Sequence, residues 1–266
     1  MILDYELTII FPVLNEKKNL EVLIPQFYKS LNEHITDFEI LVVDDNSSDG
    51  TKELIEDLQR SHTKLTYLLR TKNKSLPLSI YEGAQYAKFQ NVCWLDADGS
   101  MHIEALLNLI QTHESNQDNV VIGSRFVEGG GYKGINNLNS RKPLHILKNL
   151  RNSNDTILGM VLSNIFNKFL VKFFKSNIKD VTSGFIILNK EYLKKESFER
   201  SIYGEYFIYL IGDLIKNKIM IKEIGYICET RLFGESKTAP SLRILYIRGK
   251  AYIKAAIICK RNLNER

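Results

Sequence analysis

Two aspartates separated by a single residue follow a short apolar run in the first half of the chain. Asp96 and Asp98 come directly after Val92–Leu95, which has the composition of a buried strand. Two carboxylates at a strand end supply the hard oxygen ligands that Mg²⁺ and Mn²⁺ prefer, alongside water and substrate phosphate oxygens. A simpler interpretation is that Asp98 or Ser100 caps the helix that follows. The two interpretations are compatible, because one residue can do both.

A second acidic strand end lies earlier in the sequence. The apolar run Phe38–Val43 ends in Asp44 and Asp45, and the polar segment Asn46–Thr51 follows. An acid at this place can accept hydrogen bonds from a ribose or from a base N–H group, as in dinucleotide-binding folds. An ordinary turn, with one of residues 48–50 capping the next helix, explains the same residue types. A phosphoacceptor receiver domain also has an acidic strand end, but it spans only about 120 residues, roughly one small domain.

A third polar turn follows the first apolar run of the chain, Leu7–Leu14. It consists of Pro12–Glu16, and Asn15 is expected to cap the helix that comes next. A turn between a strand and a helix can present backbone N–H groups to an anion. The turn lacks the glycine spacing of a dinucleotide fingerprint or a phosphate loop. A simple strand exit explains it equally well.

Strands and helices alternate through about half of the chain. The runs expected to be strands are Leu7–Leu14, Phe38–Val43, Leu65–Leu69, Val92–Leu95, Val120–Ile122 and Phe185–Leu188. This alternation predicts an α/β fold with an open, mostly parallel sheet flanked by helices. Such sheets bind ligands at the carboxyl ends of their strands. The three polar strand ends are therefore expected to share one ligand-binding edge.

The composition limits the class of protein and its location. The 266 residues are 44% hydrophobic and 25% charged, enough for one large core or two modest ones. The three cysteines match no metal or disulfide spacing, which is typical of a reducing compartment. A net charge of +5 gives little support for nucleic-acid binding, and a homo-oligomer is compatible with this composition. Because the first residues are acidic and no apolar run is long enough to span a bilayer, we expect a cytoplasmic protein.

Two amphipathic helices are expected in the second half of the chain. Val161–Lys175 and Leu242–Arg261 each combine a broad apolar face with lysines and arginines. Helices of this kind lie at membrane interfaces, and they also occur as ordinary core helices with a basic solvated side. The chain is thus expected to be peripheral on the cytoplasmic face of a membrane.

The three strand ends, in this order, resemble those of the family 2 glycosyltransferases of the GT-A fold. The matching segments are Phe11–Glu16, Val43–Thr51 and Trp94–Ser100. Three later segments are similar to the polyprenyl (dolichyl) phosphate mannosyltransferase branch: Ile122–Val127 with Gly129 and Gly130, Thr182–Phe185, and Arg231–Lys237. The resemblance implies a GT-A domain over residues 1–237, with a long polar loop at 132–158. A basic amphipathic helix over residues 238–266 would follow it.

The resemblance also implies a role for individual residues. Asp96 and Asp98, with Ser100 as a weaker third ligand, would hold a Mg²⁺ or Mn²⁺ ion that bridges the donor diphosphate. Arg125 would meet the acceptor phosphate, and Arg231 would reach the donor diphosphate or the same acceptor. The residues implied around the nucleotide sugar are Pro12, Leu14, Asn15, Glu16, Asp44, Asp45, Ser183 and Lys237. Asp180 would pack the acceptor loop against the metal site.

The implied activity is an inverting, metal-dependent transfer of a sugar to a polyprenyl phosphate. The expected donor is GDP-mannose, followed by a UDP-sugar. A lipid phosphate is already ionised near neutral pH, so this reaction requires no general base, whereas Asp98 or Asp180 could act as a base toward a hydroxyl acceptor. One alternative is therefore a UDP-sugar-dependent relative that acts on a carbohydrate hydroxyl in capsule or lipopolysaccharide assembly. Another is a non-catalytic nucleotide-sugar-binding relative, because Leu76–Ser79 replaces a usually glycine-rich segment.

Overall fold

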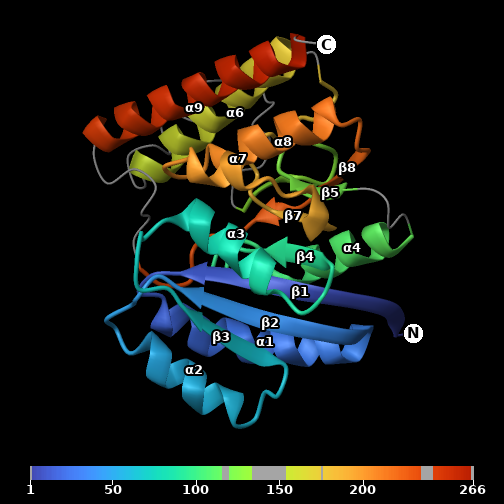
Figure 1. Ribbon diagram of the computed structural model, residues 1–266, viewed down its shortest axis with the longest axis vertical. Helices are drawn as coiled ribbons and strands as arrows, with labels where there is room; N and C mark the ends of the chain where they lie inside the picture. The colour runs from blue at the N-terminus through green and yellow to red at the C-terminus, as the bar shows by residue number, and fades with distance from the viewer. Residues whose placement is uncertain (1, 116–119, 134–153, 175, 235–241, 265–266) are drawn as a thin grey trace.

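A seven-stranded sheet forms the centre of the protein (Figure 1). The computed structural model describes residues 2–115, 120–133, 154–174, 176–234 and 242–264. The strand order is β3-β2-β1-β4-β7-β5-β8, and every pair is parallel except those that β7 makes with β4 and β5. The strands are β1 Leu3–Val13, β2 Ile35–Asp44, β3 Leu65–Leu69, β4 Asn91–Trp94, β5 Val120–Ser124, β7 Ile186–Asn189 and β8 Ile221–Gly225. The expected open, mostly parallel sheet is confirmed.

Helices cover both faces of this sheet. The described helices are α1 Lys17–His34, α2 Thr51–Gln59, α3 Leu76–Tyr86, α4 Ile103–Glu114, α6 Asn154–Phe174, α7 Lys195–Glu199, α8 Tyr206–Lys216 and α9 Leu242–Asn264. One core lies between the sheet and α1, α2 and α4, and a second lies between the sheet and α3, α6, α7, α8 and α9. Strand β1 supplies both cores, because Ile9 and Phe11 face the first and Ile10 faces the second. This burial on both faces explains why its sequence is a nearly continuous apolar run.

The residues that begin the helices after β1 and β4 differ from the predictions. The N-cap of α1 is Glu16, which makes no side-chain cap, so the expected cap by Asn15 is wrong. The N-cap of α2 is Gly50, in a left-handed conformation with φ 86°. The N-cap of α4 is His102, whose Nδ1 accepts a hydrogen bond from the Ala105 N–H at 3.2 Å. Capping by Asp98 or Ser100 is therefore wrong, and both residues remain available for other contacts.

The range predicted as a polar loop, 132–158, overlaps a described element at each end. Helix α6 begins at Asn154, and residue 132 belongs to the short strand β6 (Gly131–Tyr132). Strand β6 pairs in parallel with β9 (Ile227–Cys228) in a small second sheet. Residues 134–153 lie outside the described residues. The helix starts early because apolar residues recur with helical spacing from Ile157 onward, well before the predicted start at Val161.

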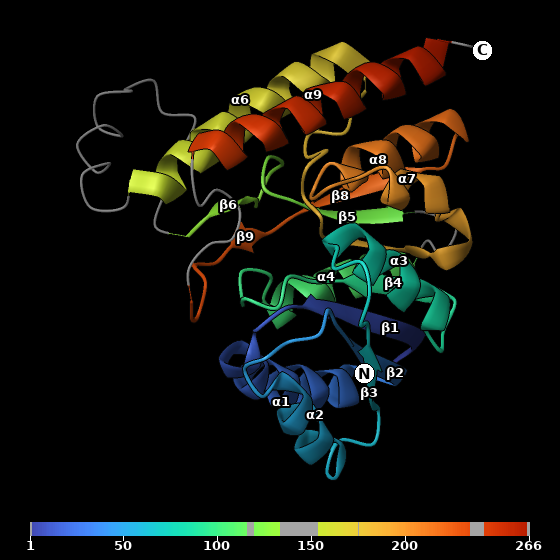
Figure 2. The ribbon, with the colours of Figure 1, turned by 60° about the vertical axis from the view of Figure 1, so that its left-hand side comes forward.

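Helices α6 and α9 lie side by side as an outer layer over α7 and α8, as both ribbon views show (Figures 1 and 2). The inner face of α9 packs on α8, where Ala255, Ala256 and Cys259 are buried. Cys259 Sγ lies 2.8 Å from the Cβ position that a side chain at Gly212 would take, so glycine allows this close approach. Within the described residues no helix is long and apolar enough to cross a bilayer.

Candidate active site

The three polar strand ends meet at one edge of the sheet, as predicted. Strands β1 and β2 run in register to their last residues, where Val13 lies opposite Asp44. The backbone N–H of Asp45 then donates to the Val13 carbonyl at 3.0 Å. On the other side of β1, the Leu95 N–H donates to the Ile10 carbonyl at 3.1 Å. Parallel pairing of β1 with β2 and β4 therefore brings the first turn, the acidic pair and the Asp96–Asp98 turn together.

The first turn is tied to the turn that follows β2. Asn15 has a left-handed backbone conformation with φ 56°, and its Oδ1 accepts a hydrogen bond from the Ser48 N–H at 2.8 Å. The Asn15 N–H donates to Ser47 Oγ at 2.8 Å. The Lys17 N–H donates to Asp49 Oδ2 at 2.9 Å. Asn15 thus cross-links two turns 32 residues apart in sequence instead of starting its own helix.

Asp44 and Asp45 are both buried and both hydrogen-bonded within the protein. Asp44 Oδ1 accepts from the N–H and the hydroxyl of Ser47, at 2.9 and 2.6 Å. Asp44 Oδ2 accepts from the Tyr67 hydroxyl at 2.7 Å. Asp45 forms an ion pair with the buried guanidinium of Arg70 and accepts from the Ser75 N–H at 2.8 Å. These contacts hold the two carboxylates in place at the predicted nucleoside end of the sheet.

Tyr67 and Arg70 are site residues that the sequence analysis did not single out. Arg70 also pairs with Glu82 of α3, through Nε at 2.7 Å and Nη2 at 3.0 Å. Burial and the hydrogen bond from Tyr67 to Asp44 raise the pKa of Tyr67, so its hydroxyl stays a donor. Both residues belong to or directly follow β3, which ends at the same edge as β2. Arg70 could have been found from the sequence, because it immediately follows the predicted strand Leu65–Leu69 and ligands bind at such strand ends.

Asp96 and Asp98 occupy different environments. Asp98 Oδ1 accepts a hydrogen bond from the Ser100 N–H at 2.9 Å, and Asp98 Oδ2 pairs with Arg231 Nη2 at 2.9 Å. The Asp96 side chain reaches solvent, and no residue in the described part of the chain donates a hydrogen bond to it. Desolvation by the surrounding protein raises the pKa of Asp96 to about 7, although the side chain keeps an exposed side. The Asp98 charge raises this pKa further, whereas Arg231 and Arg125 lower it.

These two carboxylates fit a divalent cation. The exposed carboxylate of Asp96 accepts no hydrogen bond from the described residues and lies next to that of Asp98, and such a pair is a hard oxygen donor set of the kind that Mg²⁺ and Mn²⁺ take. The described residues contain no cluster of three or more His, Cys, Asp or Glu side chains that could hold a metal by itself. A cation at Asp96 and Asp98 would therefore need further oxygens from water or from a diphosphate, which is usual for Mg²⁺.

Arg231 links the first turn to the Asp96–Asp98 turn. Its Nη2 pairs with Asp98, and its Nη1 lies 3.4 Å from Glu16 Oε1. The backbone next to Arg231 is also hydrogen-bonded to the Asp96–Asp98 turn, because the Leu232 N–H donates to the Asp98 carbonyl at 2.9 Å. The Glu229 N–H donates to the Ser100 carbonyl, also at 2.9 Å. Arg231, Glu16 and Asp98, predicted from segments more than 80 residues apart in sequence, are thus brought into direct contact.

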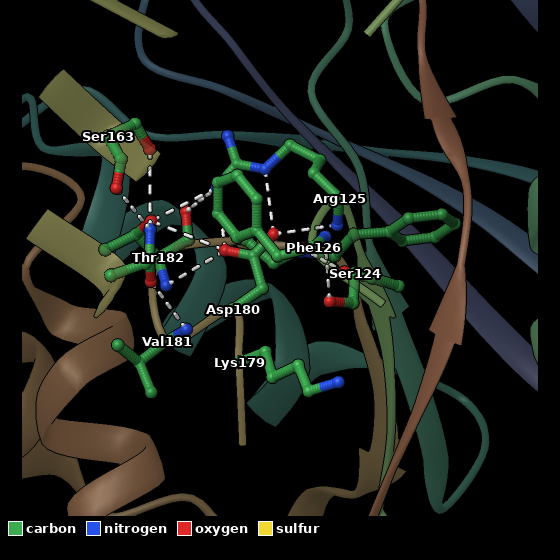
Figure 3. A network of polar contacts seen from close by, with 12 residues as sticks. Ser124, Arg125, Phe126, Ser163, Lys179, Asp180, Val181 and Thr182 are labelled. Atoms are coloured by element: carbon green, nitrogen blue, oxygen red, sulfur yellow. Dashed lines mark hydrogen bonds and ion pairs between the residues drawn. The ribbon is translucent and has the colours of Figure 1, made fainter. Parts of the chain in front are cut away.

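Arg125 is held by the fully buried carboxylate of Asp180 (Figure 3). Asp180 Oδ2 accepts hydrogen bonds from the backbone N–H and the Nε of Arg125, at 3.0 and 2.8 Å. Asp180 Oδ1 accepts from Arg125 Nη2 at 2.8 Å, and Nη2 also donates to Thr182. Burial opposes the charge of Arg125, but the Asp180 carboxylate outweighs it and raises the pKa of Arg125 well above its ordinary value. Nη1 has no hydrogen-bond acceptor among the described residues.

The loop that carries Asp180 is fixed from two sides by residues that the sequence analysis did not identify. Glu223 of β8 accepts a hydrogen bond from the Asp180 N–H at 2.9 Å. Asn167 of α6 is buried, accepts from the Val181 N–H at 2.9 Å and donates to Thr182 Oγ1 at 2.7 Å. A single Asn in an amphipathic helix carries no recognisable signal, because only its position opposite this loop gives it a role.

The other predicted residues lie as follows. The Ser183 hydroxyl donates to the Gly123 carbonyl and accepts from the Phe185 N–H at 3.3 Å, so it joins the end of β5 to the start of β7. Pro12 lies in β1 opposite Val43 of β2. Leu14 follows β1 and is partly buried, between this strand and Asn15. Lys237 lies outside the described residues.

Comparison with known sequences assigns the family. The model of the family described as Glycosyl transferase family 2 matches residues 8–196, and the chain therefore belongs to this family. It is a glycosyltransferase, as the resemblance of its sequence segments implied. A dolichol-phosphate mannosyltransferase from Pyrococcus furiosus is 30% identical over 244 residues, which cover 91% of this chain and 62% of that protein. One from Mycosarcoma maydis is 29% identical over 126 residues, covering 46% and 42%. The chain thus spans less than two thirds of the length of these relatives.

Solved structures share the fold. One is glucosyl-3-phosphoglycerate synthase from Mycobacterium tuberculosis in complex with Mn²⁺, UDP and phosphoglyceric acid, with a TM-score of 0.63 at 13% sequence identity. The match covers 96% of this chain and 78% of that one. The same protein in complex with Mg²⁺ and UDP has a TM-score of 0.62 at 12% identity, with coverage of 96% and 79%. The predicted α/β fold of the GT-A type is confirmed.

Proposed function

We propose that this glycosyltransferase moves mannose from GDP-mannose to a polyprenyl phosphate, with inversion at the anomeric carbon. The relatives named dolichol-phosphate mannosyltransferase support this choice of donor sugar and acceptor class. The observation that carries the proposal is the surroundings of Asp96, an exposed carboxylate beside Asp98 on which Arg231 and Arg125 both act electrostatically. Departure of a nucleoside diphosphate and approach of a lipid phosphate both require positive charge at one place.

Each group would have a defined part in this reaction. Asp96 and Asp98, with Ser100 beside them, would hold Mg²⁺ or Mn²⁺, which when bound neutralises charge on the leaving diphosphate. Arg231 reaches the same place from the segment after β9. Arg125 would bind the acceptor phosphate through Nη1, because its other two guanidinium nitrogens are already held by Asp180 and Thr182. Asp180 is then a positioning residue for Arg125.

The state of the carboxylates favours a phosphate acceptor over a hydroxyl. A hydroxyl acceptor requires a general base with an accessible carboxylate. Asp180 is fully buried and accepts three hydrogen bonds from Arg125, and Asp98 is paired with Arg231. Both acids that the sequence suggested as bases are therefore occupied. An ionised phosphate oxygen needs no base, and Arg125 would receive it through Nη1.

The outer helices support the proposal that the protein binds a membrane surface. The exposed stripe of α9 includes Ile253 and Ile257, which are 51% and 57% exposed, with Lys250 and Lys254 between and beside them. Along its 23 residues α9 contains lysines and arginines but no Asp or Glu. The described side chains of α6 repeat this pattern, with Ile165, Lys168, Phe169 and Lys172 exposed. Apolar and cationic residues on one face are suited to an anionic lipid surface.

The transfer reaction is tested with labelled donors in detergent. We expect GDP-[¹⁴C]mannose, dolichyl phosphate and Mn²⁺ to yield an organic-extractable mannolipid, and we expect chelation by EDTA or the change Asp96→Asn to abolish it. Asp57→Asn, on the exposed side of α2, is the matched control and should retain activity. Transfer to a carbohydrate hydroxyl from UDP-glucose without any lipid product would contradict the proposal and favour the hydroxyl-transferring alternative.

Membrane binding is tested by sedimentation with vesicles. We expect the protein to pellet with vesicles that contain phosphatidylglycerol and to remain largely unbound with pure phosphatidylcholine. Ile257→Glu should reduce pelleting, because it places a carboxylate in the stripe of α9. Val22→Glu is the matched control, since Val22 is an exposed apolar residue on α1, at the opposite end of the molecule (Figure 1). Equal loss in both variants would refute the assignment of the surface to α9.

A further inference from the structure

Arg231 lies among three carboxylates of the candidate site. Its guanidinium lies between Asp98 at 2.9 Å and Glu16 at 3.4 Å, with Asp96 close enough for its charge to matter. The side chains of this cluster are mostly shielded, with exposures of 22% for Arg231, 13% for Asp98 and 12% for Glu16. Three carboxylates near one another at the end of a sheet repel each other, and a cation among them relieves that repulsion.

We propose that Arg231 is a placeholder cation: in the free protein it neutralises Asp98, and it exchanges to the diphosphate when a divalent cation and a nucleotide bind together. This inference rests on the proposed nucleotide-sugar transfer at the same site. A divalent cation at Asp96 and Asp98 would lie next to a guanidinium already bound to Asp98. The two positive centres compete for one carboxylate, so the cation alone binds weakly. A diphosphate reverses the balance, because it provides anionic oxygens for both.

The segment that carries Arg231 is held by polar contacts and buries little apolar surface. Residues 229–234 make backbone hydrogen bonds from Glu229 to Ser100 and from Leu232 to Asp98. Phe233 also exchanges hydrogen bonds with the Asn19 side chain, and Glu229 pairs with Lys133. The side chains of Leu232 and Phe233 are about half exposed. A segment that buries little apolar surface opens at a low cost in free energy. Its displacement therefore does not require the sheet or the flanking helices to rearrange.

Gly99 allows the close approach of this segment. It has a left-handed conformation with φ 83°, and the Cβ of any other residue would lie 2.6 Å from Leu232 Cγ. Leu232 thus packs directly on the glycine between Asp98 and Ser100. The contact sets where Arg231 meets Asp98, since Arg231 directly precedes Leu232. Leu232 is consequently a positioning residue for the placeholder.

The exchange predicts opposite effects of one substitution. We expect Arg231→Gln to bind Mn²⁺ about tenfold more tightly than the unaltered protein when no nucleotide is present, since one charge-assisted hydrogen bond no longer competes. The same variant should bind Mn²⁺ with GDP or UDP about tenfold more weakly, because the diphosphate loses a cationic partner. A purely structural role would weaken binding in both conditions. Binding is measured by the electron paramagnetic resonance signal of free Mn²⁺ during titration, which does not depend on catalysis.

Two further variants complete the test. Arg200→Gln removes one positive charge from a residue that stacks on Tyr209 at 5.1 Å, and it should change neither affinity. Leu232→Ala leaves all charges in place but loosens the contact with Gly99, so Mn²⁺ alone should bind more tightly. If neither Arg231→Gln nor Leu232→Ala gains affinity for Mn²⁺ alone, the exchange is wrong and the proposed reaction stands. If the unaltered protein binds no Mn²⁺ with either nucleotide, both proposals are wrong.

Discussion

The change Asp180→Asn tests the support of Arg125 most directly. Asp180 is fully buried and receives three hydrogen bonds from Arg125, two of them from the guanidinium at 2.8 Å. The substitution preserves the volume of the side chain but leaves the guanidinium without its counter-ion. Removing one partner of a buried ion pair typically costs about 3–5 kcal/mol, because an uncompensated charge stays behind. We therefore expect the free energy of unfolding to fall by roughly 3 kcal/mol or more.

The measurement is urea unfolding followed by far-ultraviolet circular dichroism. A lower midpoint with an unchanged slope identifies a loss of stability without a change in the surface exposed on unfolding. The double variant Asp180→Asn with Arg125→Met should recover much of the loss, because it removes the unpaired charge as well. The control is Asp57→Asn, which removes an ion pair with Arg60 whose partners are 68% and 81% exposed, and no measurable change is expected.

A cost below about 1 kcal/mol for Asp180→Asn would refute the reasoning, since it would mean that Arg125 finds solvent or another partner without penalty. A double variant as unstable as the sum of the two single variants would refute it as well. It would show that the two side chains contribute independently, although the structure joins them by a bidentate pair.

Three further predictions concern the core and the thiols. Tyr206→Phe removes the hydroxyl that accepts a hydrogen bond from the buried Trp94 Nε1–H at 2.9 Å. It should lower the free energy of unfolding by about 1–3 kcal/mol in the same urea assay, and an unchanged midpoint would argue against this bond. Gly123→Ala places a Cβ 2.4 Å from Phe185 Cδ1 and should cost about 1–3 kcal/mol, whereas a stabilised variant would show that the ring moves freely. Burial raises the pKa of Cys228 to about 11, so its reaction with a disulfide reagent at pH 8 should be roughly 100-fold slower than that of a free thiol. The rate of the Cys228 reaction should rise with pH until about pH 11, and a plateau near pH 9 would contradict the raised pKa. The other two cysteines are buried, and the urea-unfolded protein provides the reference rate.

Local patterns in the sequence were sufficient for the class of fold and for most of its elements. The runs Phe38–Val43 and Leu65–Leu69 lie within strands β2 and β3, because apolar residues on both faces of a parallel strand leave a continuous signal. The predicted edge followed from the same reasoning, since consecutive parallel strands end on one side. Helix starts were less well predicted. Asn15 has the composition of a cap, yet its side chain bonds to the turn after β2.

The types of residue at the site, and their order along the chain, were determined by the sequence alone. Asp96 and Asp98 were singled out there by their place after an apolar run, and Arg231 by the resemblance of its segment to a known family. Their partners were decided only by the tertiary structure. Arg231 meets Asp98, and Asp180 is buried against Arg125, because the strand order places segments distant in sequence side by side. A hydrogen bond or ion pair depends on distances of about 3 Å, and no local pattern encodes such a distance between residues far apart in the chain.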